Sequence, residues 1–432
     1  MVIFRQILRV RLKYILIAVI VCGTMSLFKI QKFTYTPRNT ENYPILIWWT
    51  PFIFENKKLI SCEDRYTCVV TKNRSLEFDV AAYLFYGSNF KEDDLPLPKK
   101  NIPWAIFHEE SPKNLPFFLY EEGQHLFNIT STFSRDSSLP LVLQYLEDLQ
   151  LITDTTYYVN LKQKNKLLKQ ISPVLYIQSD CETPIERDLY VSELMKYIAV
   201  DSYGSCLNNK RLPEQHSVNK ILTNLYDEDF MKFVAQYKFT IAIENSICND
   251  YVTEKLWRPL IAGSIPIYWG SPTVTDWLPN NQSAILIEDY KNASHLADYI
   301  KSVNTNDKLY DSYMEHKLSG RVENQLLKDK LKGGSYGIMN NKYFPVPAFE
   351  CFVCKSMYER YSSNNNRNRS VYKCEQPKSR DTKRENWWIS HWKYGQCQAK
   401  ALSYLIETLN VSNYTKEVFD KQIEFYLSNG YC

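Results

Sequence analysis

One stretch of the chain, residues 239–272, concentrates side chains that could bind a phosphorylated sugar. Two of its acidic residues, an amide, a tyrosine and a lysine lie close together: Glu244, Asn245, Tyr251, Glu254 and Lys255. A cation at the N-terminus of a helix suits a phosphate, and a carboxylate beside it suits a sugar hydroxyl. We therefore expect this stretch to bind a nucleotide or a related phosphorylated ligand.

A βαβ unit is the arrangement that would position these side chains. Phe239–Ile243 and Ile265–Trp269 are short apolar runs typical of buried strands, and a helix-like segment from Thr253 to Ala262 lies between them. The right-handed crossover of such a unit places the first loop and the start of the helix at the carboxyl edge of the sheet. Ligands of open α/β sheets bind at that edge, so the chemistry and the predicted fold agree.

Similar runs on both sides of this unit predict two α/β domains facing a cleft. Three strands and a helix are expected in the first domain: Ile45–Trp49, Ala81–Tyr86, Trp104–Phe107 and the helix Leu141–Leu151. The second domain opens at the strand Val174–Ile177, after a basic connector. We expect boundaries of 44–165 for the first Rossmann-like domain, 170–345 for the second and 346–432 for a C-terminal segment, in which a late helix is predicted at Ala399–Leu409.

The N-terminus predicts a membrane anchor. Basic residues precede an uncharged run from Tyr14 to Phe28, which spans about 22 Å as a helix. We favour an uncleaved signal-anchor at 14–30 over a cleaved signal peptide, with a cytosolic tail at 1–13 and a stem at 31–43. The basic flank keeps the N-terminus cytosolic, so the remainder would be lumenal, in the Golgi apparatus or the endoplasmic reticulum.

Glycosylation signals and cysteines agree with that compartment. Asn-x-Ser/Thr sequons begin at Asn73, Asn128, Asn281, Asn292, Asn368, Asn410 and Asn413. Ten cysteines follow the predicted anchor, and disulfides explain them better than zinc does, because Cys351 and Cys354 have no second pair with metal spacing. The net charge of +4 without a long basic run argues against a nucleic-acid partner.

The chain resembles the eukaryotic α-1,3-fucosyltransferase family, glycosyltransferase family 10. Glu244-Asn245-Ser246 and then Asp250 to Leu256 match that family's signature, and Glu110-Ser111-Pro112 matches a motif of its first domain. The Trp-rich tail from residue 387 is similar to a divergent branch of the family. The resemblance implies two Rossmann-like domains of the GT-B type and inverting transfer of fucose from GDP-β-L-fucose, without a required divalent metal.

The resemblance also implies roles for individual residues. Glu110 would be the catalytic base, with Glu109 a solvated neighbour, because an inverting transfer needs one carboxylate to take the acceptor's proton. Arg187 and Lys255 would bind the pyrophosphate, and Glu254 the ribose. The other expected donor-site residues are Glu244, Asn245, Tyr251 and Arg135, with less support for Ser179 and Asp180.

Two of these expectations have alternatives. Arg135 could instead form an ion pair with Asp136. Asp227-Glu228-Asp229 has the form of a metal motif, but it precedes a helix and is better explained as a helix N-cap. By family pattern, Cys351 and Cys354 would bond Cys62 and Cys68.

Three functions follow in order of preference. The first is transfer of fucose, α-1,3, to GlcNAc of lumenal glycans. The second is O-fucosylation of Ser or Thr in a folded lumenal domain, such as a cysteine-rich domain of the EMI type. The third is a catalytically silent sugar-binding protein, which the joint presence of Glu110, Arg187, Glu254 and Lys255 disfavours.

Overall fold

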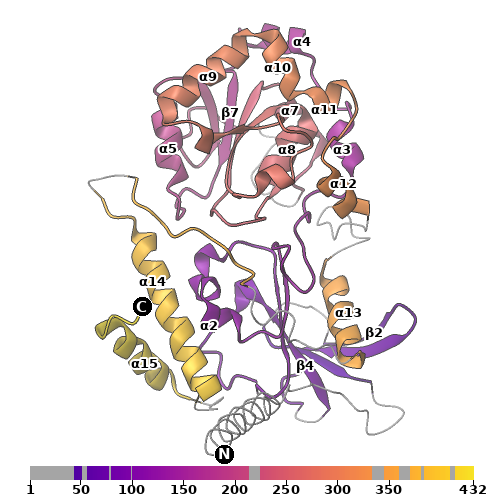
Figure 1. Ribbon diagram of the computed structural model, residues 1–432, viewed down its shortest axis with the longest axis vertical. Coiled ribbons are helices and arrows are strands. Elements are labelled where there is room, and N and C mark those ends of the chain that lie inside the picture. The colour runs from indigo at the N-terminus through magenta and orange to yellow at the C-terminus, as the bar shows by residue number, and fades with distance from the viewer. Residues whose placement is uncertain are drawn as a thin grey trace, which may run out of the picture.

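The computed structural model forms two α/β halves, one above the other in Figure 1. It describes residues 43–50, 56–76, 79–98, 100–213, 224–332, 345–359, 370–380, 384–408 and 414–432. The predicted anchor, most of the stem and three sequons, at Asn368, Asn410 and Asn413, lie outside these residues. Within the described part, no helix has both the length and the apolar character needed to cross a membrane.

A six-stranded sheet forms the first half. Its strands are β1 Ile45–Trp48, β2 Lys57–Cys62, β3 Tyr66–Thr71, β4 Val80–Tyr86, β5 Trp104–His108 and β6 Ile129–Thr132. The spatial order is β2-β3-β1-β4-β5-β6, and only the β2–β3 pair is antiparallel. The central strands are buried along almost their whole length, which explains their continuous apolar sequence.

A five-stranded parallel sheet forms the second half. Its strands are β7 Val174–Gln178, β8 Val200–Gly204, β9 Phe239–Ile243, β10 Ile265–Trp269 and β11 Ile285–Leu286. The spatial order is β11-β10-β9-β7-β8. All strands stay parallel, but successive strands are added on one side of β7 up to β8 and on the other side from β9 onward. Ligands of such sheets bind where the strand order reverses, so the loops after β7 and β9 are the expected binding edge.

Helices surround this second sheet. They are α3 Leu149–Thr153, α4 Leu161–Leu167, α5 Arg187–Leu194, α7 Glu228–Ala235, α8 Glu254–Ala262, α9 Ala293–Thr305, α10 Asp307–Tyr313, α11 Glu315–Leu318 and α12 Gln325–Lys332. Thr253 caps α8, and Gly263 ends it in the left-handed region at φ 77°, which confirms the predicted helix. Asp227 caps α7 through its carboxylate, which confirms the N-cap interpretation of that acidic run.

The C-terminal segment returns to the first half. Helix α13 (Pro345–Tyr358) packs on β2 and β3, and two disulfides, Cys62–Cys351 and Cys68–Cys354, fix it there. Residues 370–432, here called the tail, contain α14 (Trp387–Ser403) and α15 (Lys416–Ser428). Helix α14 runs beside α2 (Glu121–Gln124) in Figure 1. Its core side chains join the main apolar cluster of the first half, so the tail is part of that half's core.

Two predicted helices were correct only in part, and three strands were not predicted. Residues 141–146 form turns instead of a helix. Leu141 N–H donates to Thr132 O of β6, and all six residues are buried, whereas a helix on the surface of a domain would bury only one face. The late helix begins at Trp387, not Ala399. The hairpin β2–β3 and strand β6 were not predicted; β2 and β6 contain few apolar residues, whereas β3 is largely apolar and was overlooked.

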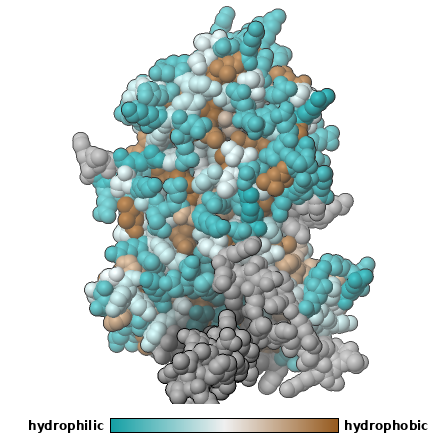
Figure 2. Space-filling view, in the orientation of Figure 1, coloured by the Kyte–Doolittle hydropathy of each residue, from teal (hydrophilic) through white to brown (hydrophobic). Residues whose placement is uncertain are grey.

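The molecular face in Figure 2 is mostly hydrophilic over the second half, and hydrophobic residues occur there in separate groups. A continuous exposed apolar patch, which would mark a large hydrophobic interface, is not present on that face among the described residues.

Candidate active site

A short loop at the end of β5 brings the first half to the second. Residues 109–114, here called the base loop, leave the sheet after His108 and turn at Pro112. The hydroxyl of Tyr251 donates to Glu110 Oε2 at 3.2 Å, and Ser111 Oγ donates to Asn245 Oδ1 at 2.7 Å. Since Tyr251 and Asn245 both follow β9, the base loop lies directly against the binding edge of the second sheet.

Glu110 is exposed, whereas its partner Tyr251 is buried and packs against Phe133 with ring centroids 4.9 Å apart. The tyrosine is thus held in place from behind, and it orients one oxygen of an otherwise accessible carboxylate. This arrangement leaves the exposed carboxylate of Glu110 able to accept a proton from a bound molecule.

Glu109 is not the solvated neighbour that we expected. Its carboxylate turns into the first half, where Tyr86 Oη donates to Oε1 at 2.7 Å. Burial raises the pKa of Glu109 to about 7. Adjacent side chains of an extended backbone point apart, so the two carboxylates face different surroundings, and only Glu110 faces the second half.

Glu244 is fully buried, which corrects its expected role as a direct donor ligand. Its two oxygens accept from the backbone N–H and the hydroxyl of Thr253, at 2.8 and 2.7 Å. Burial raises the pKa of Glu244 to about 7, although Lys255 at 3.7 Å opposes this shift. Glu244 therefore holds the N-terminus of α8 in place through Thr253.

Lys255 and Glu254 stand at that helix N-terminus. Lys255 Nζ lies 3.2 Å from Glu254 Oε1 and 3.2 Å from Thr253 Oγ1. Burial alone would lower the pKa of Lys255, but the carboxylates of Glu254 and Glu244 raise it above its ordinary value. Burial likewise opposes ionisation of Glu254, but Lys255 and Arg258 hold its pKa below the ordinary value. Both groups are therefore charged at neutral pH.

Arg187, the first residue of α5, joins the two strands at which the sheet order reverses. Its side chain is buried, and it donates to Asp180 O at 2.6 Å after β7 and to Ile243 O at 3.2 Å in β9. No partner for its Nε exists among the described residues. A buried guanidinium thus lies at the point where nucleotide phosphates bind in sheets of this kind.

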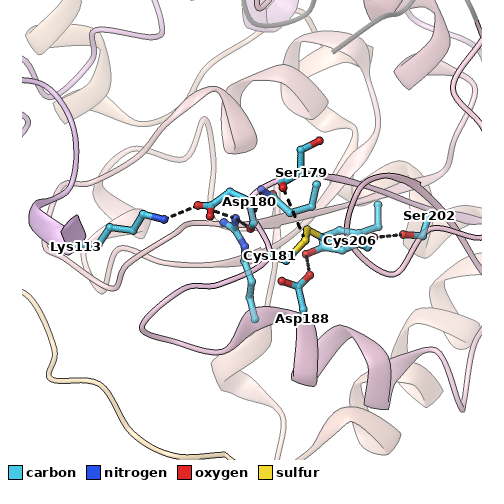
Figure 3. Close-up of a disulfide and its surroundings, with 10 residues drawn as sticks. Lys113, Ser179, Asp180, Cys181, Asp188, Ser202 and Cys206 are labelled. Atoms are coloured by element: carbon cyan, nitrogen blue, oxygen red, sulfur yellow. Dashed lines mark hydrogen bonds and ion pairs between the residues drawn. A yellow bond between two sulfur atoms is a disulfide. The ribbon is translucent and has the colours of Figure 1, made fainter. Parts of the chain in front are cut away.

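Asp180 is shared between two cations, and Figure 3 shows the contact with one of them, Lys113. Lys113 Nζ of the base loop lies 2.5 Å from Asp180 Oδ2, and the guanidinium of Arg187 lies 3.6 Å from the same oxygen. Lys113 was not predicted, although it belongs to the same turn as Glu110 and its sequence position was the available signal. Ser179 is exposed beside this group, and its carbonyl faces Cys181.

A disulfide explains the one metal-like cluster of the described residues. Cys181, Asp188 and Cys206 place ligand atoms close together, but Cys181 is bonded to Cys206. Bonded sulfurs are not thiolate ligands, so this cluster stabilises the loop after β7. The three cysteines of the tail are also bonded: Cys374 pairs with Cys248 of the second half, and Cys397 pairs with Cys432.

Arg135 is committed to an ion pair across the two halves, and its partner is not Asp136. Its side chain donates to Asp250 at 2.6 and 2.9 Å and to Asp276 at 2.7 Å, and it lies over the Trp277 ring at 4.5 Å. Asp136 pairs with Lys373 instead. Arg135 therefore joins the segment after β6 of the first half to the loop after β9 of the second. This ion pair is sufficient to explain why an arginine lies here.

Replacing Asp250 with asparagine is expected to lower the free energy of unfolding by about 2 kcal/mol, because Arg135 loses its buried carboxylate. Burial opposes ionisation of Asp250, but the bonds from Arg135 hold its pKa below the ordinary value. The stabilisation is thus present above that ordinary value and is lost as the pH falls, so wild type and variant converge in acid. Denaturant unfolding at several pH values measures this, with Asp136→Asn as a control expected to cost under about 0.5 kcal/mol.

The four described sequons differ in exposure. Asn73, Asn281 and Asn292 are exposed, and Asn292 also caps α9 through its oxygen. Asn128 is 8% exposed, and its Oδ1 accepts from Trp104 N–H at 3.0 Å inside the first half. The structure therefore does not support a glycan on Asn128, because a buried amide holding a strand cannot carry one.

Comparison with known proteins places the chain in a family. The family model described as "Fucosyltransferase, N-terminal" matches residues 40–145, and "Glycosyltransferase family 10 (fucosyltransferase) C-term" matches residues 161–368. A protein of Xenopus laevis named "GDP-fucose protein O-fucosyltransferase 3" is 47% identical over 74% of this chain and 68% of its own length. The human protein of that name is 46% identical over 74% of this chain and 66% of its own length.

Among solved structures, an "alpha1,3-Fucosyltransferase with GDP" aligns with 76% of this chain and 95% of its own length, at 19% identity and a TM-score of 0.44. The chain thus spans about two-thirds of the curated relatives that it matches.

Proposed function

The chain belongs to glycosyltransferase family 10, the fucosyltransferases, and on that premise we propose that it transfers fucose from GDP-β-L-fucose to a Ser or Thr hydroxyl of a protein. The contact of the base loop with Tyr251 and Asn245 carries this proposal, because it sets an accessible carboxylate against the donor edge of the second half.

The acceptor preferred from the sequence was wrong. We expected α-1,3 transfer to GlcNAc of glycans, whereas vertebrate relatives at 44–47% identity are named protein O-fucosyltransferases. The family signature that led to the first expectation lies in the donor half, and donor residues do not report which hydroxyl is fucosylated. The acceptor proposed here is therefore a protein.

The proposed reaction is a single displacement with inversion. Glu110 removes the proton of the acceptor hydroxyl as that oxygen forms a bond to C1 of fucose, and the bond from C1 to the phosphate oxygen breaks. GDP leaves with the electron pair. Arg187 and Lys255, one at the start of α5 and the other at the start of α8, stabilise the negative charge that develops on the pyrophosphate.

Further donor contacts follow from the same geometry. Glu254 is the proposed acceptor of hydrogen bonds from the ribose, and Asn245 with Tyr251 lines the sugar pocket. Arg187 and Lys255 are the proposed counter-charges of the leaving group, so we propose that a divalent metal is not required.

The wider architecture is proposed as the GT-B type, with the donor site in the second half and the acceptor site facing the first. We further propose the single-pass anchor at 14–30 and a lumenal location in the Golgi apparatus or endoplasmic reticulum, on the sequence pattern alone. Five disulfides and the exposed sequons at Asn73 and Asn281 support an oxidising, glycosylating compartment.

Mass spectrometry tests the proposed acceptor. The enzyme is incubated with GDP-fucose and a folded cysteine-rich domain of the EMI type, and fucose is sought on tryptic peptides and on enzymatically released N-glycans. Fucose on Ser or Thr of a peptide is expected. Fucose only on released glycans would return the acceptor to GlcNAc, and no consumption of GDP-fucose would favour a silent sugar-binding protein.

A further inference from the structure

A cavity of about 550 Å³ lies beside the candidate active site and is used by no step proposed above. Its walls come from the loop before α5, the ends of β10 and β11, and the tail. The side chains that matter to its chemistry are Tyr190, Trp269, Glu288, Tyr290, Lys291 and Arg380. Three aromatic rings and several charged groups thus surround one hollow.

The tail forms the outer wall of this cavity. Residues 373–380, here called the strap, cross from the first half to the second. The Cys248–Cys374 disulfide and the backbone bond from Glu375 N–H to Ile247 O, at 2.8 Å, hold the strap against the loop after β9. Farther along the tail, Asn386 donates to Pro184 O at 2.8 Å and so fixes the segment after the strap to the loop before α5. The strap lies beyond residue 368, where the match to the family model ends.

The cavity adjoins the reaction centre through short pieces of chain. Ile247, in its wall, is four residues before Tyr251, which holds Glu110. Ile185, also in its wall, is two residues before Arg187. The cavity therefore adjoins both the loop that holds Glu110 and the loop that leads into Arg187.

Arg380 and Trp269 set the kind of ligand that fits. The guanidinium lies 3.9 Å from the centroid of the indole, and Arg380 Nε donates to Ile185 O at 2.9 Å. Tyr190 packs on the same indole at 5.8 Å. A sugar ring that stacks on tryptophan needs an open indole face, and here both neighbours cover it. The covered indole argues against a carbohydrate subsite.

The charges favour a polypeptide with an acidic side chain. Glu288 accepts from Trp269 Nε1 at 3.2 Å, and Glu375 pairs with Lys378 at 3.5 Å. Within the described residues, neither Lys291 nor Arg380 forms a salt bridge, although the carboxylates of Glu186 and Glu288 partly compensate the charge of Arg380. Counting Lys378 as paired with Glu375, Lys291 and Arg380 are the cations of this wall that can bind a ligand. Arginine beside tyrosine and tryptophan is typical of the centre of protein–protein interfaces.

We propose that this cavity binds a segment of the acceptor protein that carries an acidic residue near the fucosylated Ser or Thr. The inference rests on the proposed function, since it names the part of the enzyme that selects the protein acceptor. Arg380 and Lys291 bind the carboxylate, and the aromatic rings contact the neighbouring side chains. Because the strap lines this cavity, the tail supplies part of the proposed acceptor site.

Two charge reversals test this site, Arg380→Glu and Lys291→Glu, with Arg321→Glu as a matched control on an exposed loop away from the cavity. Each reversed charge is expected to raise the KM for the folded acceptor domain about tenfold or more, which is the typical cost of one lost charged contact. The kcat, the KM for GDP-fucose and the slow hydrolysis of GDP-fucose by water should change less than about twofold.

The outcomes separate the inference from the proposed function. An unchanged acceptor KM in both variants, or an equal rise in the KM for GDP-fucose, would overturn the cavity as an acceptor site while protein fucosylation stands. Inhibition of the wild type by a lactosamine oligosaccharide that Arg380→Glu abolishes would show a sugar site and overturn it too. If the wild type hydrolyses GDP-fucose but transfers none to protein, the proposed function fails first and the inference fails with it.

Discussion

Replacing Glu110 with glutamine is expected to lower the rate of fucose transfer about a thousandfold, because an amide cannot take the proton of the acceptor hydroxyl. Shape and the hydrogen bond from Tyr251 are nearly preserved, since the amide oxygen of glutamine still accepts. Binding of GDP, measured by calorimetry, should therefore stay within about twofold of wild type. The transfer rate is measured with saturating GDP-fucose and acceptor.

Glu109→Gln is the matched control for that experiment. Its carboxyl group faces Tyr86 in the first half, so its loss should cost less than about tenfold in rate, through small shifts of the base loop. Transfer by Glu110→Gln at the wild-type rate would remove Glu110 as the base. A larger loss for Glu109→Gln than for Glu110→Gln would exchange the two roles.

Replacing Arg187 with methionine is expected to lower the transfer rate about a hundredfold or more and to weaken GDP binding, because a cation is lost where the leaving group gains charge. The guanidinium of Arg187 also donates to Asp180 O and Ile243 O, so the substitution removes the hydrogen-bond donor that joins the segments at the ends of β7 and β9. Initial rates over a range of GDP-fucose concentrations, with calorimetry of GDP, measure both effects.

Arg187→Lys separates charge from geometry in this experiment. A single ammonium keeps the charge but cannot reproduce the two-pronged contact, so an intermediate rate is expected. Arg321→Met on an exposed loop is the neutral control. Wild-type affinity for GDP in Arg187→Met would show that the pyrophosphate lies elsewhere.

The central part of the second half was largely predictable from sequence, for a local reason. Strand β9, the start of α8 and strand β10 are consecutive in the chain, so their order alone brings Asn245, Glu254 and Lys255 to one edge. Turn and cap residues agreed with the apolar pattern there, and the prediction of α8 was confirmed. A segment can be predicted from its sequence when its local preferences agree with the fold that it adopts.

Long-range pairings were not predictable in the same way. The bond of Arg135 to Asp250 joins residues far apart in sequence, and the local Asp136 was the natural but incorrect guess. The burial of Glu244 and the inward turn of Glu109 depend on the packing of both halves, which no short pattern encodes. In the tail, only the second part of the helical stretch from Trp387 to Thr408 was predicted, and α15 was not, since these helices bury side chains in a core that is formed mainly by the distant first half.

The central claim is that a protein hydroxyl receives the fucose. The most direct test compares kcat/KM for a folded EMI-type domain with kcat/KM for a lactosamine glycan, using one enzyme preparation and one GDP-fucose concentration. We predict a preference of about a hundredfold or more for the protein, since the cavity lined by the strap is proposed to bind a peptide segment that a free glycan lacks. An equal or higher kcat/KM for the glycan would contradict the account.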